Sequence, residues 1–161
     1  MSAAYSAEWN LGVLGGDDGG RFLYFAYGSN MNRARMLSRC PGARKVGTGT
    51  VGGWAVVERL YADLERRKGE RTAGVVWSIT RDDLAALDRA EGFPFVYDCL
   101  VARVRMGRTG REARCLVYIM TQAAREARDG TPYPEWYRAI CSEGARANGV
   151  RDVFAAAARV G

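Results

Sequence analysis

The chain has 161 residues, of which 48% are hydrophobic and 26% charged, a composition typical of one ordinary globular domain. It contains no histidine, which excludes a Ser-His-Asp triad, a Cys-His pair and every histidine metal site. The formal net charge is +6, and only two of the 24 basic residues, Lys45 and Lys68, are lysines. Because the arginines are scattered and no nucleic-acid motif accompanies them, this charge predicts a solvated basic surface and no nucleic-acid partner.

The residue composition and the spacing of the cysteines also predict where the protein is located and how its domains are organised. No segment approaches the roughly 20 consecutive apolar residues of a membrane span, and the first residues lack the basic leader of a signal peptide. We therefore expect a flexible lead-in over residues 1–20 and a single domain over residues 21–161. The cysteines are widely spaced without a C-x-x-C pair, which predicts reduced, packed thiols, a cytoplasmic protein and no metal site. They are Cys40, Cys99, Cys115 and Cys141.

The first predicted element is a strand over residues 22–27. This run is continuously apolar, as expected for a strand that is buried on both faces. Gly28-Ser29-Asn30 interrupts it, and we expect Asn30 to cap a helix over residues 31–39. Pro41-Gly42 then ends that helix.

The middle of the chain predicts two further strands and a short helix. The strands cover residues 49–58 and 72–79, and the charged stretch 64–71 between them is expected to form an exposed loop or hairpin tip. Residues 80–83, Thr-Arg-Asp-Asp, come close to a capping-box pattern and begin a helix. Gly92 is a natural residue to end it.

The rest of the chain, from residue 95 onward, is predicted to form a hairpin followed by helices. Two strands, over residues 95–105 and 114–120, are joined by a glycine-containing turn at residues 107–110. A helix over residues 134–149 has proline in its first turn and glycine at its end, and a last short helix is expected over residues 152–159. Strands and helices that do not strictly alternate favour an α+β domain with a mixed sheet.

The segment that follows the first predicted strand is the first candidate functional site. A glycine there lets the backbone approach a ligand, and the start of a helix leaves backbone N–H groups unpaired beside a positive partial charge. The segment Tyr27-Gly28-Ser29-Asn30 therefore suits a carboxylate or a developing oxyanion. The alternative is a capped helix after a tight turn, with no ligand.

Glu91 is the second candidate. It continues the apolar stripe formed by Leu84 and Leu87, so its charge is aimed at the core, where burial raises the pKa of a carboxyl group. A raised pKa suits a general acid or base. The alternative is a last-turn glutamate that reaches solvent. Asp88 lies off the centre of the stripe and is less well placed.

The third candidate is the C-terminal helix. Tyr137, Ile140 and Gly144 recur at helical spacing and share one face, which for such stripes usually means core packing. Gly144 predicts very close contact with another element. A buried Tyr137 hydroxyl needs a hydrogen-bond partner.

In this order the candidates resemble the γ-glutamylcyclotransferase family. The resemblance begins with Tyr-Gly-Ser-Asn at residues 27–30, continues through Gly-Val-Val-Trp at residues 74–77 and Leu-Asp-Arg-Ala-Glu-Gly at residues 87–92, and ends in Gly-Ala-Arg-Ala-Asn-Gly at residues 144–149. It covers residues 22 to about 150. It implies a small mixed-sheet β-barrel flanked by helices and a reaction without a cofactor or metal.

The resemblance also implies a reaction and its residues. The α-amine of a γ-glutamyl substrate attacks the side-chain carbonyl of the same glutamyl group, which releases 5-oxoproline and an amino acid or amine. Glu91 matches the family's catalytic glutamate and is expected to act as general acid and base. The expected substrate-binding residues are Tyr24, Phe25, Ala26, Tyr27, Gly28, Ser29, Asn30 and Tyr137.

Several alternatives stay open. The main alternative is a related cyclotransferase of the same fold that acts on a γ-glutamylamine or removes a γ-glutamyl protecting group from a specialised metabolite. The segments 93–95 and 59–71 are expected to border the leaving-group side, so the released amine is undefined. A non-catalytic binding module is the alternative of a different class. The expected partner is a small γ-glutamyl molecule, and a monomer and a homodimer are both compatible with the sequence.

Overall fold

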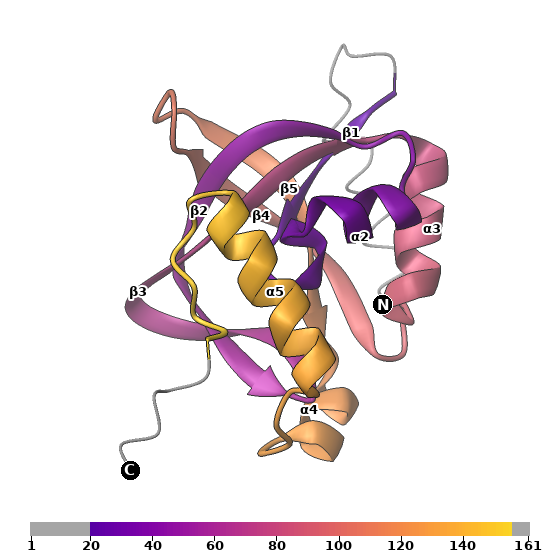
Figure 1. The fold of residues 1–161 in the computed structure, drawn as a ribbon, viewed down its shortest axis with the longest axis vertical. Coiled ribbons are helices and arrows are strands. Elements are labelled where there is room, and N and C mark those ends of the chain that lie inside the picture. The colour runs from indigo at the N-terminus through magenta and orange to yellow at the C-terminus, as the bar shows by residue number, and fades with distance from the viewer. Residues whose placement is uncertain (1–19, 156–161) are drawn as a thin grey trace.

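The computed structural model describes residues 20–155, which form a closed barrel of five strands (Figure 1). The strand order is β1-β3-β2-β4-β5. Neighbouring strands are antiparallel except β1 and β5, which run parallel where the barrel closes, with Tyr24 opposite Leu116. This arrangement confirms the predicted mixed sheet. The strands are β1 (Phe22–Ala26), β2 (Arg44–Arg59), β3 (Tyr61–Ile79), β4 (Tyr97–Met106) and β5 (Glu112–Met120).

The longest pairing, between β2 and β3, corrects the prediction of a loop at residues 64–71. Those residues lie within β3, and the hairpin turns at Leu60, whose φ is 63°. The pairing register between β2 and β3 shifts at Gly53 of β2. The most charged part of residues 64–71 is exposed although it belongs to β3. The expected exposure is therefore confirmed for residues 66–71, whereas Leu64 is buried and the expected loop is wrong.

The helices lie outside the barrel, and Figure 1 shows α5 beside α2, with α3 next to α2. The predicted capping box is confirmed: Thr80 and Asp83 bond reciprocally at the start of α3, and Gly92 ends that helix at φ 68°. The elements are η1, a 3₁₀ turn (Ser29–Met31), α2 (Arg33–Arg39), α3 (Arg81–Glu91), α4 (Gln122–Arg128) and α5 (Glu135–Ala147). No helix within residues 20–155 has the length and apolar character needed to cross a membrane.

The cap of α2 differs from the prediction. Asn32, not Asn30, caps this helix, and its side chain accepts a hydrogen bond from the backbone N–H of Arg35 at 3.3 Å. The reason is that residues 29–31 form a separate 3₁₀ turn before α2 begins. The side chain of Asn30 is thereby free for other contacts.

The C-terminal part also differs in detail. The predicted helix over residues 152–159 does not form in residues 152–155, and its remainder lies outside the described residues, as does the predicted lead-in apart from Gly20. The helix predicted from Pro134 is confirmed as α5, and Gly149 follows its end at φ 66°.

Close packing of α5 positions the 3₁₀ turn. A Cβ atom on Gly144 would lie 2.6 Å from the backbone nitrogen of Asn32, so only glycine permits this approach and the predicted close contact is confirmed. Asn148 donates from Nδ2 to the backbone oxygen of Met31 at 3.0 Å. The two contacts fix α5 against the segment that follows β1.

Four buried cysteines contribute to the core, and all of them are free thiols, as predicted. Burial raises the pKa of the Cys40 thiol to about 12. These groups are therefore protonated at neutral pH and behave as small apolar side chains.

The barrel wall contains one fully buried carboxylate, that of Asp63 on β3. It accepts hydrogen bonds from the backbone N–H groups of Leu64 and Met120, each at 2.8 Å. The guanidinium groups of Arg59 and Arg125 add ion pairs at 2.9 Å each. The carboxylate thereby ties β3 to β5 and to α4.

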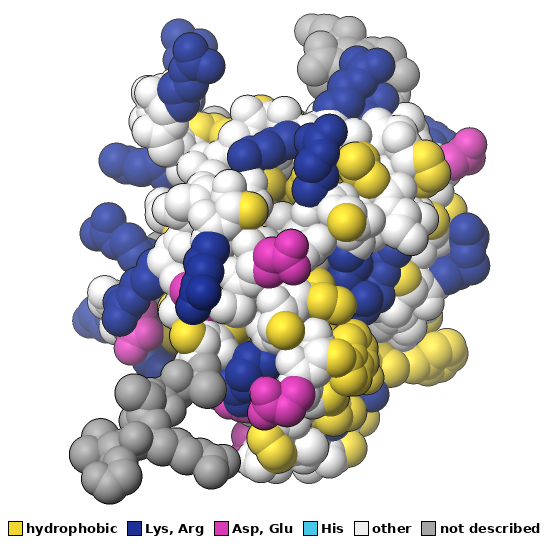
Figure 2. Space-filling view, in the orientation of Figure 1, with side chains coloured by type: hydrophobic (Ala, Val, Ile, Leu, Met, Phe, Trp, Pro, Cys, Tyr) yellow, Lys and Arg dark blue, Asp and Glu magenta, His cyan; other side chains and the backbone are white. Residues whose placement is uncertain are grey.

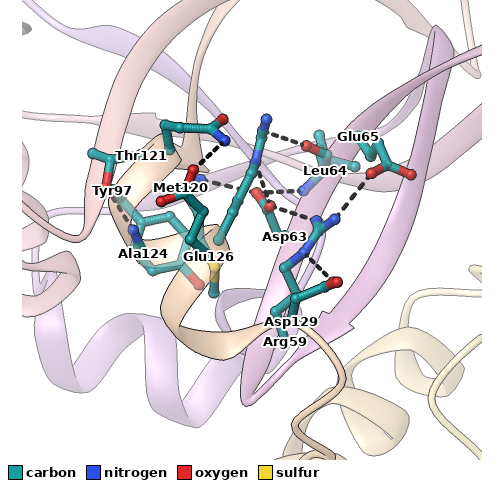
Figure 3. A network of polar contacts seen from close by, with 12 residues as sticks. Arg59, Asp63, Leu64, Glu65, Tyr97, Met120, Thr121, Ala124, Glu126 and Asp129 are labelled. Atoms are coloured by element: carbon teal, nitrogen blue, oxygen red, sulfur yellow. Dashed lines mark hydrogen bonds and ion pairs between the residues drawn. The ribbon is translucent and has the colours of Figure 1, made fainter.

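Figure 3 shows how Arg59 extends this network. Its guanidinium reaches Asp63, Glu65 and Asp129 together, with distances of 2.9, 2.9 and 3.1 Å. Arg59 is itself buried, whereas the side chain of Asp129 is 72% exposed. Loss of Asp63 is therefore expected to cost more than loss of Asp129, because it leaves a buried charge without its partner, whereas exposed ion pairs contribute little.

We expect Asp63→Asn to lower the free energy of unfolding by about 3–5 kcal/mol, since the amide leaves Arg59 and Arg125 without their buried counter-charge. Urea unfolding followed by tryptophan fluorescence measures the change. Asp129→Asn is the matched control, because it removes an exposed partner of Arg59 and should cost less than about 1 kcal/mol. Equal losses in the two variants would contradict this assignment.

Candidate functional site

A cavity of about 300 Å³ lies where β1, η1, α3 and α5 meet. The candidate residues predicted from sequence that line it are Tyr24, Tyr27, Gly28, Ser29, Asn30, Glu91 and Tyr137. The other lining residues are Arg35, Arg39, Tyr61, Ala62, Arg89, Ala90, Gly92, Val96, Tyr97, Tyr118, Arg128 and Trp136.

Two of the predicted binding residues do not line the cavity. Phe25 and Ala26 are buried in the core, with exposed fractions of 0% and 1%. The ring of Phe25 lies against Gly74 of β3 at a distance that leaves no room for a Cβ there. Because alternate residues of a strand face opposite sides, Tyr24 and Phe25 cannot share one surface. The prediction extended the binding wall over too many consecutive residues.

Glu91 is the last residue of α3 and the single carboxylate in the lining of this cavity. As the stripe predicted, its side chain is turned inward: it lies at the wall of the cavity with only 17% of its surface exposed. Its Oε1 lies 3.3 Å from Nδ2 of Asn30 and 3.6 Å from Nη1 of Arg39. Burial raises the pKa of Glu91, while the charges of Arg39 and Arg35 and the bond from Asn30 oppose the rise.

Asn30 connects the two sides of the site. Its Nδ2 donates to Glu91 and also to the hydroxyl of Tyr24 at 3.0 Å, and its Oδ1 accepts from Nη1 of Arg39 at 3.1 Å. Its backbone oxygen accepts from the indole of Trp77 at 3.0 Å. With both ends of its amide engaged, Asn30 holds the carboxylate of Glu91 in one orientation.

The segment before Asn30 presents backbone N–H groups. Within residues 20–155, the amide N–H groups of Gly28, Ser29 and Asn30 donate to no acceptor, whereas the carbonyls of Gly28 and Ser29 are engaged by the following turn. A Cβ on Gly28 would lie 3.1 Å from the hydroxyl of Tyr137. Glycine thus allows the chain to pass close to Tyr137. The free N–H groups provide the donors that the sequence predicts for a carboxylate or oxyanion.

Tyr137 contributes a buried hydroxyl. Its oxygen accepts a hydrogen bond from the backbone N–H of Ala62 at 3.0 Å, so the predicted partner exists. Its ring packs edge-on against Tyr61, with centroids 5.0 Å apart. Burial raises the pKa of Tyr137 well above its ordinary value, so the phenol is neutral at pH 7 and retains a proton to donate.

Sequence reasoning missed the cations of the site. The lining contains four arginines against the one carboxylate of Glu91: Arg35, Arg39, Arg89 and Arg128. Arg35 donates from Nε to the hydroxyl of Ser29 at 3.0 Å. Arg35 and Arg39 are four residues apart and therefore lie on one face of the helix after the Gly-Ser-Asn segment. This spacing was the sequence pattern that could have identified them as site residues.

The cavity therefore combines one carboxylate with cations, tyrosines and free backbone donors. Within the part of the chain that the structure describes, no three histidine, cysteine or acidic side chains are grouped to hold a metal ion. Elsewhere on the surface, Lys and Arg side chains are spread over the face in Figure 2 and do not gather at one spot. Fold and cavity together define a small β-barrel protein suited to a small anionic ligand.

Comparison with known proteins gives the family. The sequence model of the family described as gamma-glutamyl cyclotransferase, AIG2-like, matches residues 24–138. The gamma-glutamylcyclotransferase of Mus musculus is 32% identical to this chain over 149 residues, which cover 84% of this chain and 76% of the mouse protein. The Homo sapiens protein of the same name is 30% identical over 151 residues, with the same coverage of both chains. A solved structure of a gamma-glutamyl cyclotransferase superposes with a TM-score of 0.68 at 26% identity, covering 80% of each chain. The chain belongs to this family.

The electrostatics of the site predict how Glu91 titrates. Because the charge of Arg39 lowers the pKa of Glu91 against the effect of burial, Arg39→Gln should raise that pKa further, while the glutamine amide can still donate to Asn30. A ¹³C NMR titration of the carboxyl groups, with Glu91→Gln to assign the signal, measures this. Arg108→Gln, at an exposed turn, should leave the midpoint unchanged. A midpoint in Arg39→Gln at or below that of the unsubstituted protein would contradict the prediction.

Proposed function

We propose that this protein is a γ-glutamylcyclotransferase in which Glu91 serves as general base and general acid. The observation that carries the proposal is the position of Glu91, which is the one carboxylate lining the cavity and lies beside Asn30, in the segment with free backbone N–H groups. The relatives that bear this name share about 30% of their residues with the chain over most of its length, which supports the reaction class.

The reaction needs no nucleophile from the protein. The α-amino nitrogen of the γ-glutamyl group bonds to the γ-carbonyl carbon of the same group, and the bond from that carbon to the leaving nitrogen then breaks. The products are 5-oxoproline and an amino acid or amine. Because attacking and attacked atoms belong to one molecule, the cavity only has to hold the glutamyl chain in a folded conformation.

Glu91 moves the protons that this reaction requires. The carboxylate first accepts a proton from the α-ammonium group, which frees the nitrogen lone pair for attack. It then returns this proton to the leaving nitrogen as the carbon–nitrogen bond breaks. The attacking nitrogen, now bonded to the carbonyl carbon, loses a second proton, which passes to the released amine, so the amine leaves as an ammonium and Glu91 ends in its starting state. A raised pKa suits this double role, since the group must both gain and lose a proton near neutral pH.

Charge that develops on the carbonyl oxygen needs donors. The backbone N–H groups of residues 28–30 would supply them in a fixed position, and fixed donors stabilise an oxyanion without reorganising. The neighbouring guanidinium of Arg35, held by Ser29, gives a counter-charge for the carboxylate of the glutamyl group. Tyr24, Tyr27 and Tyr137 complete the wall around it.

Two alternatives differ in what they predict for the site. A related cyclotransferase that acts on a γ-glutamylamine, or removes a protecting group, would use the same glutamyl pocket and differ only on the leaving-group side. A non-catalytic binding module has no use for a shielded carboxylate whose burial raises its pKa, and Glu91 therefore favours catalysis. The four reduced, buried thiols favour a cytoplasmic location.

We expect Glu91→Gln to keep the fold and lose about 10²- to 10⁴-fold in turnover, because the amide cannot move the protons. The assay incubates the protein with a mixture of γ-glutamyl dipeptides and γ-glutamylamines and detects 5-oxoproline by mass spectrometry. The matched control is Glu112→Gln on the exposed side of β5, which should retain full activity.

Two results would contradict the mechanism. Near-normal activity of Glu91→Gln would remove the acid–base role of this residue. Release of free glutamate in place of 5-oxoproline would show that water, and not the substrate's own amine, attacks the carbonyl.

The proposed chemistry requires no metal ion, so activity should survive dialysis against EDTA. Rates before and after chelation, with and without added Mg²⁺ or Zn²⁺, test this expectation. A loss that a divalent ion restores would show that a metal takes part.

A further inference from the structure

Arg128, the last residue of α4, stands apart from the other cations that line the cavity. Its Nη1 atom is buried and has no hydrogen-bond partner within residues 20–155, and its guanidinium forms no ion pair there. By contrast, Arg35 bonds to Ser29, and Arg39 bonds to Asn30 and pairs with Glu91. Among the four arginines that line the cavity, Arg128 is therefore the one whose buried Nη1 donor has no acceptor within the described residues.

An unpaired buried donor is costly, and native proteins seldom keep one without a reason. The guanidinium lies 5.6 Å from the ring centroid of Tyr61, a contact that holds the charged plane beside the cavity. A planar guanidinium with free N–H groups matches a carboxylate, which accepts two parallel hydrogen bonds from it. The structure therefore presents a carboxylate-binding group that no part of the described chain satisfies.

Arg128 also comes from a different element than the charged side chains and backbone donors assigned to the glutamyl part. Those groups lie on η1, α2 and the end of α3, whereas Arg128 belongs to α4 and packs on the first residue of β3. Tyr97 lines the same cavity as Glu91 and Arg128, and burial raises the pKa of its hydroxyl well above the ordinary value. Because Arg35 is assigned to the carboxylate of the glutamyl group, the carboxylate left for Arg128 is the one on the leaving group.

We propose that Arg128 binds the carboxylate of the leaving group and makes the enzyme select γ-glutamyl amino acids over γ-glutamylamines. This inference rests on the proposed function. The charges of the lining agree with it, since four arginines face one glutamate. A γ-glutamyl amino acid carries two carboxylates and one ammonium, while a γ-glutamylamine carries one of each and is neutral.

Two substrates that differ only in that carboxylate provide the test: γ-glutamylalanine and γ-glutamylethylamide. The unsubstituted protein should prefer γ-glutamylalanine. Arg128→Gln should lower kcat/KM for γ-glutamylalanine about 10- to 100-fold, mainly through KM, as expected for loss of a charged hydrogen-bonded pair. Its kcat/KM for γ-glutamylethylamide should stay within about twofold, which also shows that the variant is folded.

Controls separate this role from general effects of charge. Arg108→Gln removes the same charge at an exposed turn away from the cavity and should change neither substrate. Arg128→Lys keeps the charge without the planar fork and should restore only part of the preference.

The possible outcomes are distinct. If Arg128→Gln weakens both substrates equally, the residue serves the glutamyl part or the fold, and the inference is wrong. An unchanged preference in that variant overturns it as well. If the unsubstituted protein converts both substrates equally, the leaving-group carboxylate is not recognised. If it converts neither, while other γ-glutamyl compounds also yield no 5-oxoproline, the proposed function itself fails and the inference falls with it.

Discussion

The hydrogen bonds of one side chain, Asn30, hold the candidate site together. They join β1, through Tyr24, to the end of α3, through Glu91, and to α2, through Arg39. These contacts exist because the chain makes a separate 3₁₀ turn before α2, so that Asn32 takes over the capping. The position of the Glu91 carboxylate therefore depends on the 3₁₀ turn at residues 29–31. Helix α5 stabilises this turn by packing its Gly144 against Asn32.

The protein places two shielded carboxylates in contrasting surroundings. Asp63 accepts two backbone hydrogen bonds and faces two guanidinium groups, so its negative charge is fully compensated inside the barrel wall. Glu91 has one amide donor and one cation at 3.6 Å, and burial still raises its pKa. The well-compensated group stabilises the fold, and the poorly compensated one is available for proton transfer.

Sequence patterns predicted the fold class and the features governed by local chemistry. The capping box of α3 and the close packing at Gly144 depend on a few neighbouring residues or on one helix face, and both are confirmed. The loop expected at residues 64–71 fails because pairing with β2 and the ion pairs of Glu65 outweigh the polar character of the stretch. The arginines of the cavity were missed, since only the folded chain brings Arg128 of α4 near Glu91 of α3.

Closure of the barrel has a consequence for how copies of the chain can meet. Each of the five strands in the described part has a neighbour on both sides, including the short β1, which lies between β3 and β5. This closure covers only part of the two long strands, because residues 51–59 of β2 and 61–72 of β3 have no strand partner in the described part other than each other. Addition of a strand from another copy is therefore confined to the edges of this extended hairpin, since elsewhere the closed barrel leaves its strands paired on both sides.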